Sequence, residues 1–401
     1  MKLKITRGSL LTMTYSALIV NVILGMIFKF ASLSILRKLF IISKVLVLAT
    51  IIFSGLVDLI IFSKCRFKIH LDGILLIFFV IYEMYISKIR GLLIFPNAYL
   101  DILIWPLIYL LFRNFTERCD IPQEFGKLTE ISMAFVLLLS IPLIIKHRAG
   151  LGDVGGVVFY VYYCVTFLPM ALYAIENDKR KHRLLLLTIL MLALSTKRSG
   201  TIVAVIGYAI YLFTNVSVRK DIKNKLIKYW KYILLFLVAA VAVMAFDQLF
   251  SLSILTRLKN IGTDKGSGRE AIWIEVFDAF SKSKGDLKMF GHGFQAVYYR
   301  LKPYGVDRLA HNSFIEFLYD YGYVGLGIFF GFLATQLIGA IKAIQHKNLH
   351  APEMLYSLLV AVAFGLFSYF FEESTIIVPI AAFWGCFVGT NSRSACKKVL
   401  R

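Results

Sequence analysis

The sequence has 401 residues, of which 59% are hydrophobic and 17% charged, and its mean hydropathy is +0.74. Soluble domains are roughly half apolar and roughly a quarter charged, so this composition excludes an ordinary soluble protein and predicts one that resides in a bilayer. The formal net charge of +21 arises partly from basic loops beside membrane spans, and we do not interpret it as a nucleic-acid-binding surface.

Apolar windows long enough to cross a membrane recur along the chain and predict about twelve transmembrane helices. In chain order they are residues 9–28, 39–62, 71–87, 98–112, 129–145, 155–175, 183–195, 199–214, 232–250, 312–341, 354–371 and 375–390. We therefore expect an all-α fold, a polytopic membrane protein whose long outer loop carries short amphipathic helices.

These windows divide the chain into three parts. Residues 1–250 hold transmembrane helices 1–9, residues 251–310 form a polar loop, and residues 311–401 hold transmembrane helices 10–12 and a cytoplasmic tail. Lys and Arg residues are more frequent in the loops on the same side as the N-terminus; the bias is weak in the first half of the chain and clear in the second. It predicts that both termini are cytoplasmic and that the long loop faces outward. None of the five cysteines lies in that loop, so we expect no disulfide framework there.

The first candidate site residue is Arg198, at the outer end of the eighth predicted span. It closes the very short turn Ser195–Arg198 between two spans. An arginine at a helix end usually anchors the helix at the membrane surface. At the N-terminal end of a helix it also has the chemistry to bind an anion.

The polar loop 251–310 contains ten Lys or Arg residues against six Asp or Glu residues, which suits an anionic partner such as lipid phosphate, pyrophosphate or an acidic sugar. Its glycine-rich stretch 262–268 leads to Arg269 and then to residues 270–280, whose aromatic side chains at helical spacing predict an amphipathic helix on the membrane surface. The N-terminus of such a helix, with Arg269, is a candidate anion site. A linker whose Arg269 touches lipid headgroups is the alternative.

The third candidate is His311, which with Asn312 opens the tenth predicted span. A single histidine at such a place is most often an ordinary polar residue. Under the predicted topology, however, Arg198, Arg269 and His311 all lie at the outer boundary and at helix N-termini, where anions are favoured and a protonated imidazole is not. The set fits two arginines that hold phosphate beside a neutral histidine that accepts a proton.

Carboxylates supply weaker candidates. Glu316 and Asp320 are four residues apart on one helix face near His311, and Glu372 precedes Glu373 in a short outer turn; both sets are candidate acceptor-sugar contacts or ordinary structural groups. Four further carboxylates, Asp58, Glu83, Asp101 and Asp247, are scattered in or near spans and are free to pair with basic residues there. We expect no metal, because no HExxH motif or histidine cluster occurs, and we interpret His292 as a turn residue.

Several short motifs occur in a fixed order in the second half of the chain. They are Ser195-Thr-Lys-Arg198-Ser-Gly200, Gly266-Ser-Gly268-Arg269-Glu-Ala-Ile-Trp273, Gly291-His-Gly293-Phe294, His311-Asn312-Ser-Phe-Ile-Glu316 and Gly322-Tyr-Val-Gly325. Their order, spacing and sidedness resemble the O-antigen ligase and polymerase family over about residues 195–341. The first half resembles the family only in hydropathy.

This resemblance implies a glycosyltransferase of the bacterial inner membrane, with its active site on the periplasmic side, whose donor is a glycan on undecaprenyl pyrophosphate. It implies that Arg198 and Arg269 hold the pyrophosphate and that His311 acts at the acceptor hydroxyl. No cofactor and no nucleic acid are expected. The lipid-linked oligosaccharide and the bilayer are the expected partners, and a chain-length regulator is a further candidate. A single displacement inverts the anomeric configuration, and no carboxylate stands out as a covalent nucleophile.

Three functions remain open at this point. We favour a polymerase of O-antigen or capsule repeat units, because Lys197-Arg198-Ser199 and the Gly-Arg-x-x-x-Trp stretch are more typical of polymerases. A ligase that moves the glycan to lipid A–core uses the same donor and chemistry. A flippase for lipid-linked glycans is the alternative of another class, although one would expect charges along a central cavity and related halves.

Overall fold

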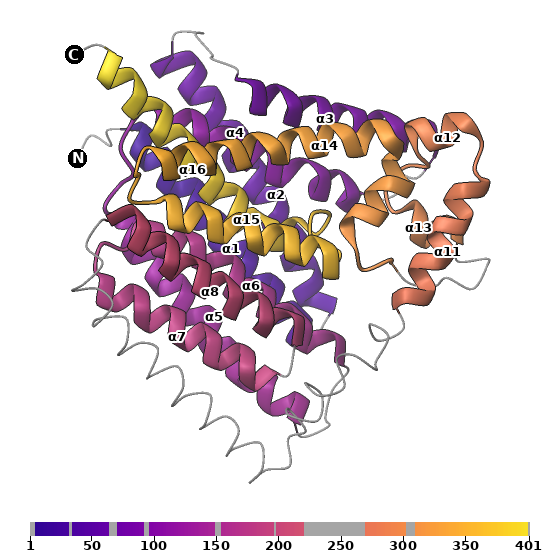
Figure 1. Cartoon of the computed structure of the whole chain (residues 1–401), viewed down its shortest axis with the longest axis horizontal. Coiled ribbons are helices and arrows are strands. Elements are labelled where there is room, and N and C mark those ends of the chain that lie inside the picture. Colours follow the sequence, from indigo (N-terminus) through magenta and orange to yellow (C-terminus); the bar gives the residue numbers. More distant parts are fainter. Residues whose placement is uncertain are drawn as a thin grey trace. The chain divides into compact units, whose positions relative to one another are not determined.

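The computed structural model describes residues 5–31, 34–63, 70–91, 96–148, 154–195, 198–219, 269–301 and 309–399, and within these ranges it contains helices and no strand (Figure 1). The elements are α1 (Arg7–Ala31), α2 (Ser34–Val57), the π-helical turn η1 (Asp58–Phe62), α3 (Leu71–Ile89), α4 (Pro96–Arg118), α5 (Glu124–Arg148), α6 (Val154–Ala174), α7 (Asp178–Ser195), α8 (Arg198–Arg219), α11 (Arg269–Lys282), α12 (Gly285–Phe290), α13 (Ala296–Leu301), α14 (Ser313–Gln345), α15 (Ala351–Phe367) and α16 (Ser374–Val399).

Every predicted span coincides with one of these helices, except the window 232–250, which lies outside the described residues. Among the described helices, five are both long and apolar enough to cross a membrane; they include α1, α14 and α16. Prolines inside α4, α5, α6 and α16 are compatible with membrane helices, where neighbouring groups satisfy the freed carbonyls. The chain is thus a helical, multi-pass membrane protein, while the count of twelve spans and the side of the long loop stay predictions.

The chain forms two compact units. The first comprises Met1–Ser43, Cys119–Gly262 and Ala340–Val360, and the second comprises Lys44–Arg118, Thr263–Gly339 and Ala361–Arg401. In the first unit α5 packs closely on α6 at Gly126, where an added Cβ atom would meet the Ala174 carbonyl oxygen at 2.7 Å. On α1, Tyr15 stacks on Phe125 of α5 and shares a hydrogen bond of 3.0 Å with the Thr129 hydroxyl.

In the second unit α16 is the most buried of the apolar helices and packs along α4. Two glycines one turn apart permit this contact: a Cβ atom on Gly385 would meet the Tyr109 carbonyl oxygen at 2.6 Å, and one on Gly389 would meet the Arg113 carbonyl oxygen at 2.3 Å. Small residues four apart let two helix backbones approach closely, which is how membrane helices gain packing energy when lipid replaces water.

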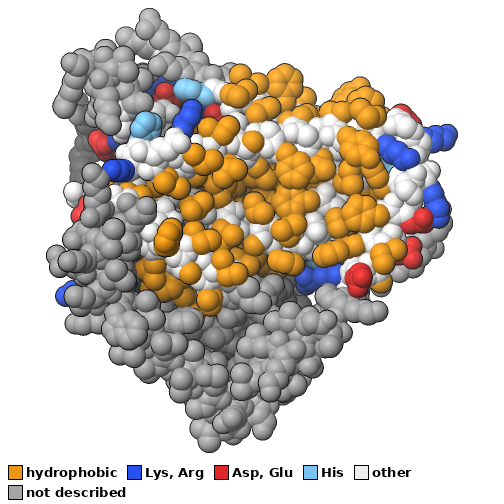
Figure 2. Space-filling model, viewed as in Figure 1, with side chains coloured by type: hydrophobic (Ala, Val, Ile, Leu, Met, Phe, Trp, Pro, Cys, Tyr) orange, Lys and Arg blue, Asp and Glu red, His pale blue; other side chains and the backbone are white. Residues whose placement is uncertain are grey.

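A stripe of exposed apolar side chains runs along α3 at helical spacing: Leu71, Ile74, Phe78, Ile81, Tyr85 and Ile89. A similar set follows the second half of α14: Tyr323, Phe330, Leu337, Ile338 and Ile341. Figure 2 shows hydrophobic side chains covering much of the described part of this face, with charged side chains gathered at its ends. Exposed apolar side chains that follow whole helix faces are unusual for a soluble monomer, which indicates contact with lipid.

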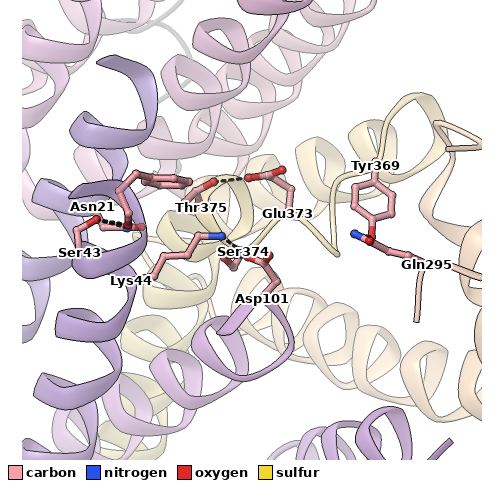
Figure 3. A network of polar contacts seen from close by, with 10 residues as sticks. Asn21, Ser43, Lys44, Asp101, Gln295, Tyr369, Glu373, Ser374 and Thr375 are labelled. Carbon is pink, nitrogen blue, oxygen red and sulfur yellow. Dashed lines mark hydrogen bonds and ion pairs between the residues drawn. The ribbon is translucent and has the colours of Figure 1, made fainter. Parts of the chain in front are cut away.

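Two of the carboxylates that the sequence left scattered in the spans, Asp58 and Asp101, have basic partners in the structure. Asp58 accepts an ion-pair contact of 3.1 Å from Arg118. Asp101 lies 2.5 Å from the Lys44 ammonium group and accepts a hydrogen bond from Ser374, and Figure 3 shows both side chains directed at it. Pairing of this kind is how a buried charge is tolerated. Asp247 lies outside the described residues, and Glu83 belongs to a cluster considered below.

A kink divides α14 at Gly322, whose φ of 64° and ψ of −168° are not helical. Because of the kink, carbonyl groups of the first segment of α14 lack helical hydrogen-bond donors. Backbone N–H groups of the turn after α12 act as the donors instead. The His292 N–H donates to the Tyr319 carbonyl at 3.1 Å, and the Gly293 N–H donates to the Asp320 carbonyl at 2.7 Å. The Gly-His-Gly motif and the kinked helix therefore form one structural element, which positions the N-terminal segment of α14.

Candidate active site

The polar segment before α14 packs with the start of α14 around one small core. Val276 and Phe280 of α11, Ala296, Val297 and Leu301 of α13, and Ala310, Ile315 and Tyr319 form one buried cluster. The opposite face of α11 leaves Ile274 and Phe277 exposed. The amphipathic helix predicted for residues 270–280 is confirmed, and it begins at Arg269. The glycine-rich stretch 262–268 lies outside the described residues.

Arg269 joins the start of α11 to the end of α15. Its Nη1 donates a hydrogen bond of 2.6 Å to the carbonyl oxygen of Phe367, the last residue of α15. Carbonyl groups at a helix C-terminus carry partial negative charge, which holds the guanidinium in place. No carboxylate of the described residues forms an ion pair with Arg269. The guanidinium therefore has donors left for an anionic ligand.

Trp273 lies one helical turn after Arg269 and connects α11 to the segment that holds His311. Its indole N–H donates a hydrogen bond of 2.7 Å to the Ala310 carbonyl oxygen. The turn 368–371 makes a second connection, because the Ser313 N–H donates to the Ser368 carbonyl at 3.2 Å. Arg269, His311 and the turn before α16 are thus held in one region of the second unit.

His311 has a left-handed backbone conformation, with a φ of 53°. Two neighbouring side chains hold this conformation. The Asn312 Oδ1 accepts hydrogen bonds from the Phe314 and Ile315 N–H groups at 3.0 and 3.2 Å, which makes Asn312 the N-cap of α14. The buried Glu316 carboxylate accepts the Ala310 N–H and contacts the His311 N–H. The strained residue is therefore fixed by its surroundings, as is common at functional sites.

Asp320 and Glu372 complete a carboxylate cluster with Glu316. All three side chains are buried, and one oxygen of each lies within 4.8 Å of the others. Asp320 accepts the Val297 N–H at 3.3 Å and so supports α13. Burial raises the pKa of the Glu372 carboxyl well above its usual range, and the nearby charges of Asp320 and Glu316 raise it further. The three carboxyls and the Asn312 side chain are buried in the structure. Their direct contact with an acceptor sugar stays a prediction.

Tyr369 lies beside this cluster. Its hydroxyl accepts a hydrogen bond of 3.0 Å from the Gln295 side chain, as Figure 3 shows. It is near enough to Glu372 to interact with that carboxyl, but neither Glu372 oxygen has a hydrogen bond of good geometry. Gln295 has a positive φ of 56° in the turn before α13. This contact ties the turn to the segment between α15 and α16.

His292 occupies a turn, as the sequence predicts, and it is almost fully buried. Its ring stacks on Tyr319 with a centroid distance of 4.2 Å, and its Nε2 shares a hydrogen bond of 2.9 Å with the Ser283 hydroxyl. Burial lowers the pKa of the imidazole to about 4, and the nearby charges of Arg300 and Arg90 lower it further, against a smaller opposing effect of Asp286. The contacts indicate a structural role, which keeps the turn on α14.

The structure brings together most of the residues that the sequence singled out. Arg269, His311, Asn312, Glu316, Asp320 and Glu372 belong to the second unit and are linked by the contacts above. Arg198 is the first residue of α8 in the first unit. The structure does not describe the Arg198 side chain, so the binding of one pyrophosphate by Arg198 and Arg269 together stays a prediction. The sequence did not predict that Trp273 connects α11 to the segment of His311. Its four-residue spacing from Arg269, which places both residues on one helix face, was the available signal.

Comparison with known families gives one result. Residues 184–330 match the family model described as O-antigen ligase. The matched stretch contains α8, α11, α12, α13 and the kink of α14, and with them Arg198, Arg269 and His311. No curated protein matches the chain.

Proposed function

We propose that this chain, whose residues 184–330 match the family model described as O-antigen ligase, is a polysaccharide polymerase for O-antigen or capsule repeat units. It transfers a glycan from undecaprenyl pyrophosphate to the acceptor sugar of another lipid-linked repeat. It acts on the periplasmic side of the bacterial inner membrane, with both termini in the cytoplasm.

The observation that carries this proposal is the position of Arg269. Its guanidinium is anchored to the Phe367 carbonyl and pairs with no described carboxylate, and its helix is bound to the segment that holds His311. Pyrophosphate leaves readily when its developing charge is stabilised, and a guanidinium matches phosphate oxygens with two parallel hydrogen bonds. Arg269 then holds the leaving group, and Arg198 supplies a second guanidinium.

His311 is assigned as the general base. A sugar hydroxyl is a poor nucleophile, and a neutral imidazole within hydrogen-bond reach takes its proton as the oxygen attacks the anomeric carbon. The new glycosidic bond forms while the bond to pyrophosphate breaks, so a single displacement inverts the anomeric configuration. The N-cap at Asn312 and the Glu316 carboxylate keep the His311 backbone in its left-handed conformation and act as positioning groups.

Two further features support a lipid-linked donor. The apolar face of α11, the helix that begins at Arg269, leaves Ile274 and Phe277 exposed. A helix of this kind lies in the interfacial region of a bilayer, where a lipid diphosphate also resides. The substrate then reaches the arginine without leaving the membrane. A chain-length regulator is a further candidate partner of this segment.

The ligase remains the second candidate, because the matched family is described by that activity. A flippase has less support, since the matched family is described as a ligase.

A reaction with purified components tests the proposal. The protein is mixed with its undecaprenyl-pyrophosphate-linked repeat unit, with and without lipid A–core. A ladder of longer lipid-linked glycans in the absence of the core is the expected result. Product that forms only with the core identifies a ligase. No product in either mixture, from folded protein and a verified cognate substrate, overturns the enzyme assignment.

A further inference from the structure

Three carboxyl groups meet inside the second unit although they come from two separate segments. Glu316 and Asp320 lie one turn apart in the N-terminal segment of α14, and Glu372 lies in the turn before α16. Their exposed fractions are 0%, 0% and 4%. One oxygen of each lies within 4.8 Å of the other two.

Each of these carboxyls keeps an oxygen that no hydrogen bond satisfies among the described residues. Glu316 uses Oε1 for the Ala310 N–H and leaves Oε2, and Asp320 uses Oδ1 for the Val297 N–H and leaves Oδ2. Neither oxygen of Glu372 has a hydrogen bond of good geometry, although the Tyr369 hydroxyl is near enough to interact with this carboxyl. Buried polar atoms without partners are rare because each one costs about 1–3 kcal/mol, and charged ones cost more.

A fourth carboxyl gives an independent indication of a ligand. Glu83 of α3 is 3% exposed and accepts the Tyr321 hydroxyl on Oε1 at 2.5 Å, while its Oε2 has no partner. Its charge acts on Glu372. No lysine or arginine of the described residues forms an ion pair with any of the four groups. Elsewhere in the same unit the buried Asp58 and the partly buried Asp101 do have basic partners.

We propose that Glu316, Asp320 and Glu372 bind one divalent cation of the calcium or magnesium class, with Glu83 as an outer carboxylate. Carboxylate oxygens are the donors that such hard cations prefer, and nitrogen or sulfur donors are absent from the cluster. Oxygens no more than 4.8 Å apart leave a central ion within reach of all three, at roughly the 2.3–2.6 Å of calcium–oxygen bonds.

The cation connects the two segments that position the candidate active site. The N-terminal segment of α14 follows His311, and the segment between α15 and α16 contains the Phe367 carbonyl that holds Arg269. The Ser313 hydroxyl already accepts the Phe370 N–H at 2.8 Å between them. The bound ion therefore stabilises this junction and does not touch the pyrophosphate. The sequence predicts no metal, because no HExxH motif or histidine cluster occurs and Glu372 lies far along the chain from Glu316 and Asp320.

Terbium luminescence measures binding directly and independently of glycosyl transfer, so its outcome is separable from that of the proposed function. Tb³⁺ replaces calcium in oxygen sites, and excited tyrosines beside the cluster, Tyr321 and Tyr369, transfer energy to it. We expect saturable emission from chelator-treated protein, with competition by Ca²⁺. Glu372→Gln should weaken the binding at least about tenfold, since one of three anionic ligands becomes neutral.

Glu373→Gln is the matched control, because Glu373 is adjacent in sequence but bonds to the Thr375 hydroxyl and lies outside the cluster. It should bind Tb³⁺ as the wild type does. Glu83→Gln should weaken binding less than Glu372→Gln does. Size-exclusion chromatography in detergent confirms that each variant is folded.

Thermal unfolding gives a second measurement. Added Ca²⁺ should raise the Tm of the wild type and of Glu373→Gln but leave that of Glu372→Gln almost unchanged. In chelator alone Glu372→Gln should be the more stable protein, because it removes repulsion between buried carboxylates. Absence of Tb³⁺ emission and of any Tm shift at about 1 mM Ca²⁺, a concentration that saturates ordinary calcium sites, overturns the proposal. Equal binding by the wild type and Glu372→Gln does so as well.

Discussion

At the scale of single residues, the candidate site depends on one strained position. His311 has a φ of 53°, a conformation that few residues other than glycine adopt, although asparagine, aspartate and histidine are enriched there. The Asn312 cap and the Glu316 carboxylate fix it. This explains why substitutions at His311 must preserve the backbone if they are to report on the imidazole alone.

The substitution His311→Asn removes the imidazole, and asparagine is compatible with the left-handed backbone conformation at this position. We expect kcat to fall by about 10²- to 10⁴-fold, the usual contribution of a general base, with the Tm almost unchanged. His311→Ala is the contrasting variant, since it adds backbone strain to the loss of the base. Full activity of His311→Asn would show that another group takes the proton.

Arg269→Gln keeps a hydrogen-bond donor but removes the charge that we assign to the pyrophosphate. Activity should fall by about 10²- to 10³-fold, as for loss of one group that stabilises transition-state charge. Lys282→Gln, at the other end of α11, is the control, because Lys282 is exposed and pairs with Asp278 on the surface. Equal effects of the two changes would indicate a general role of α11 charge and not a specific site.

His292 predicts a pH dependence of stability. The native imidazole has a pKa of about 4, against about 6.5 in an unfolded chain. Between these values the unfolded chain binds a proton that the native protein does not, so the free energy of unfolding decreases as the pH falls from about 6.5 to about 4, and this contribution is constant below that. The decrease in Tm between pH 7 and pH 5 should be smaller in His292→Gln, and an identical decrease would contradict the assignment.

At the scale of elements, the second unit depends on the pairing of a kinked helix with a glycine turn. Gly291 and Gly322 both have positive φ angles, of 84° and 64°. A Cβ atom on Gly291 would meet the Asp320 carbonyl oxygen at 2.3 Å, and one on Gly322 would meet the Met289 carbonyl oxygen at 2.5 Å. Tyr82 closes the junction, because its hydroxyl contacts both the Phe290 and Tyr321 carbonyls at 2.9 Å.

Gly322→Ala should destabilise the protein by at least about 2 kcal/mol, because the backbone conformation is essentially restricted to glycine and the methyl group has no space. The Tm in detergent should decrease and activity should fall with it. Gly327→Ala on the same helix is the control. Its Cβ atom would meet nothing within 4 Å, so the change should be neutral or stabilising by up to about 1 kcal/mol. Similar Tm values for the two variants would contradict this account of the kink.

At the scale of the whole molecule, the proposed mechanism assigns one arginine of each unit to the donor. Arg198 begins α8 in the first unit, and Arg269 begins α11 in the second. If both guanidiniums hold the same pyrophosphate, their contributions are coupled. A double-mutant cycle with Arg198→Gln and Arg269→Gln should then show a coupling energy of about 0.5–3 kcal/mol in kcat/KM. Strictly additive losses would indicate that the two arginines act on different groups.

The sequence by itself determined the properties that depend on local composition and spacing. Apolar windows located every described long helix, and the aromatic spacing located α11. The order of short motifs pointed to the family whose model matches residues 184–330. These features follow from hydropathy and helical periodicity, which depend only on residues close together in the sequence.

Only the tertiary structure decided which distant residues meet. Arg269 bonds to Phe367, which lies 98 residues away, and Tyr321 of α14 bonds to Glu83, which lies 238 residues away. The carboxylate cluster likewise joins α14 to the turn before α16. No local pattern encodes such contacts, because helix packing and the glycine kink of α14 determine which segments face each other.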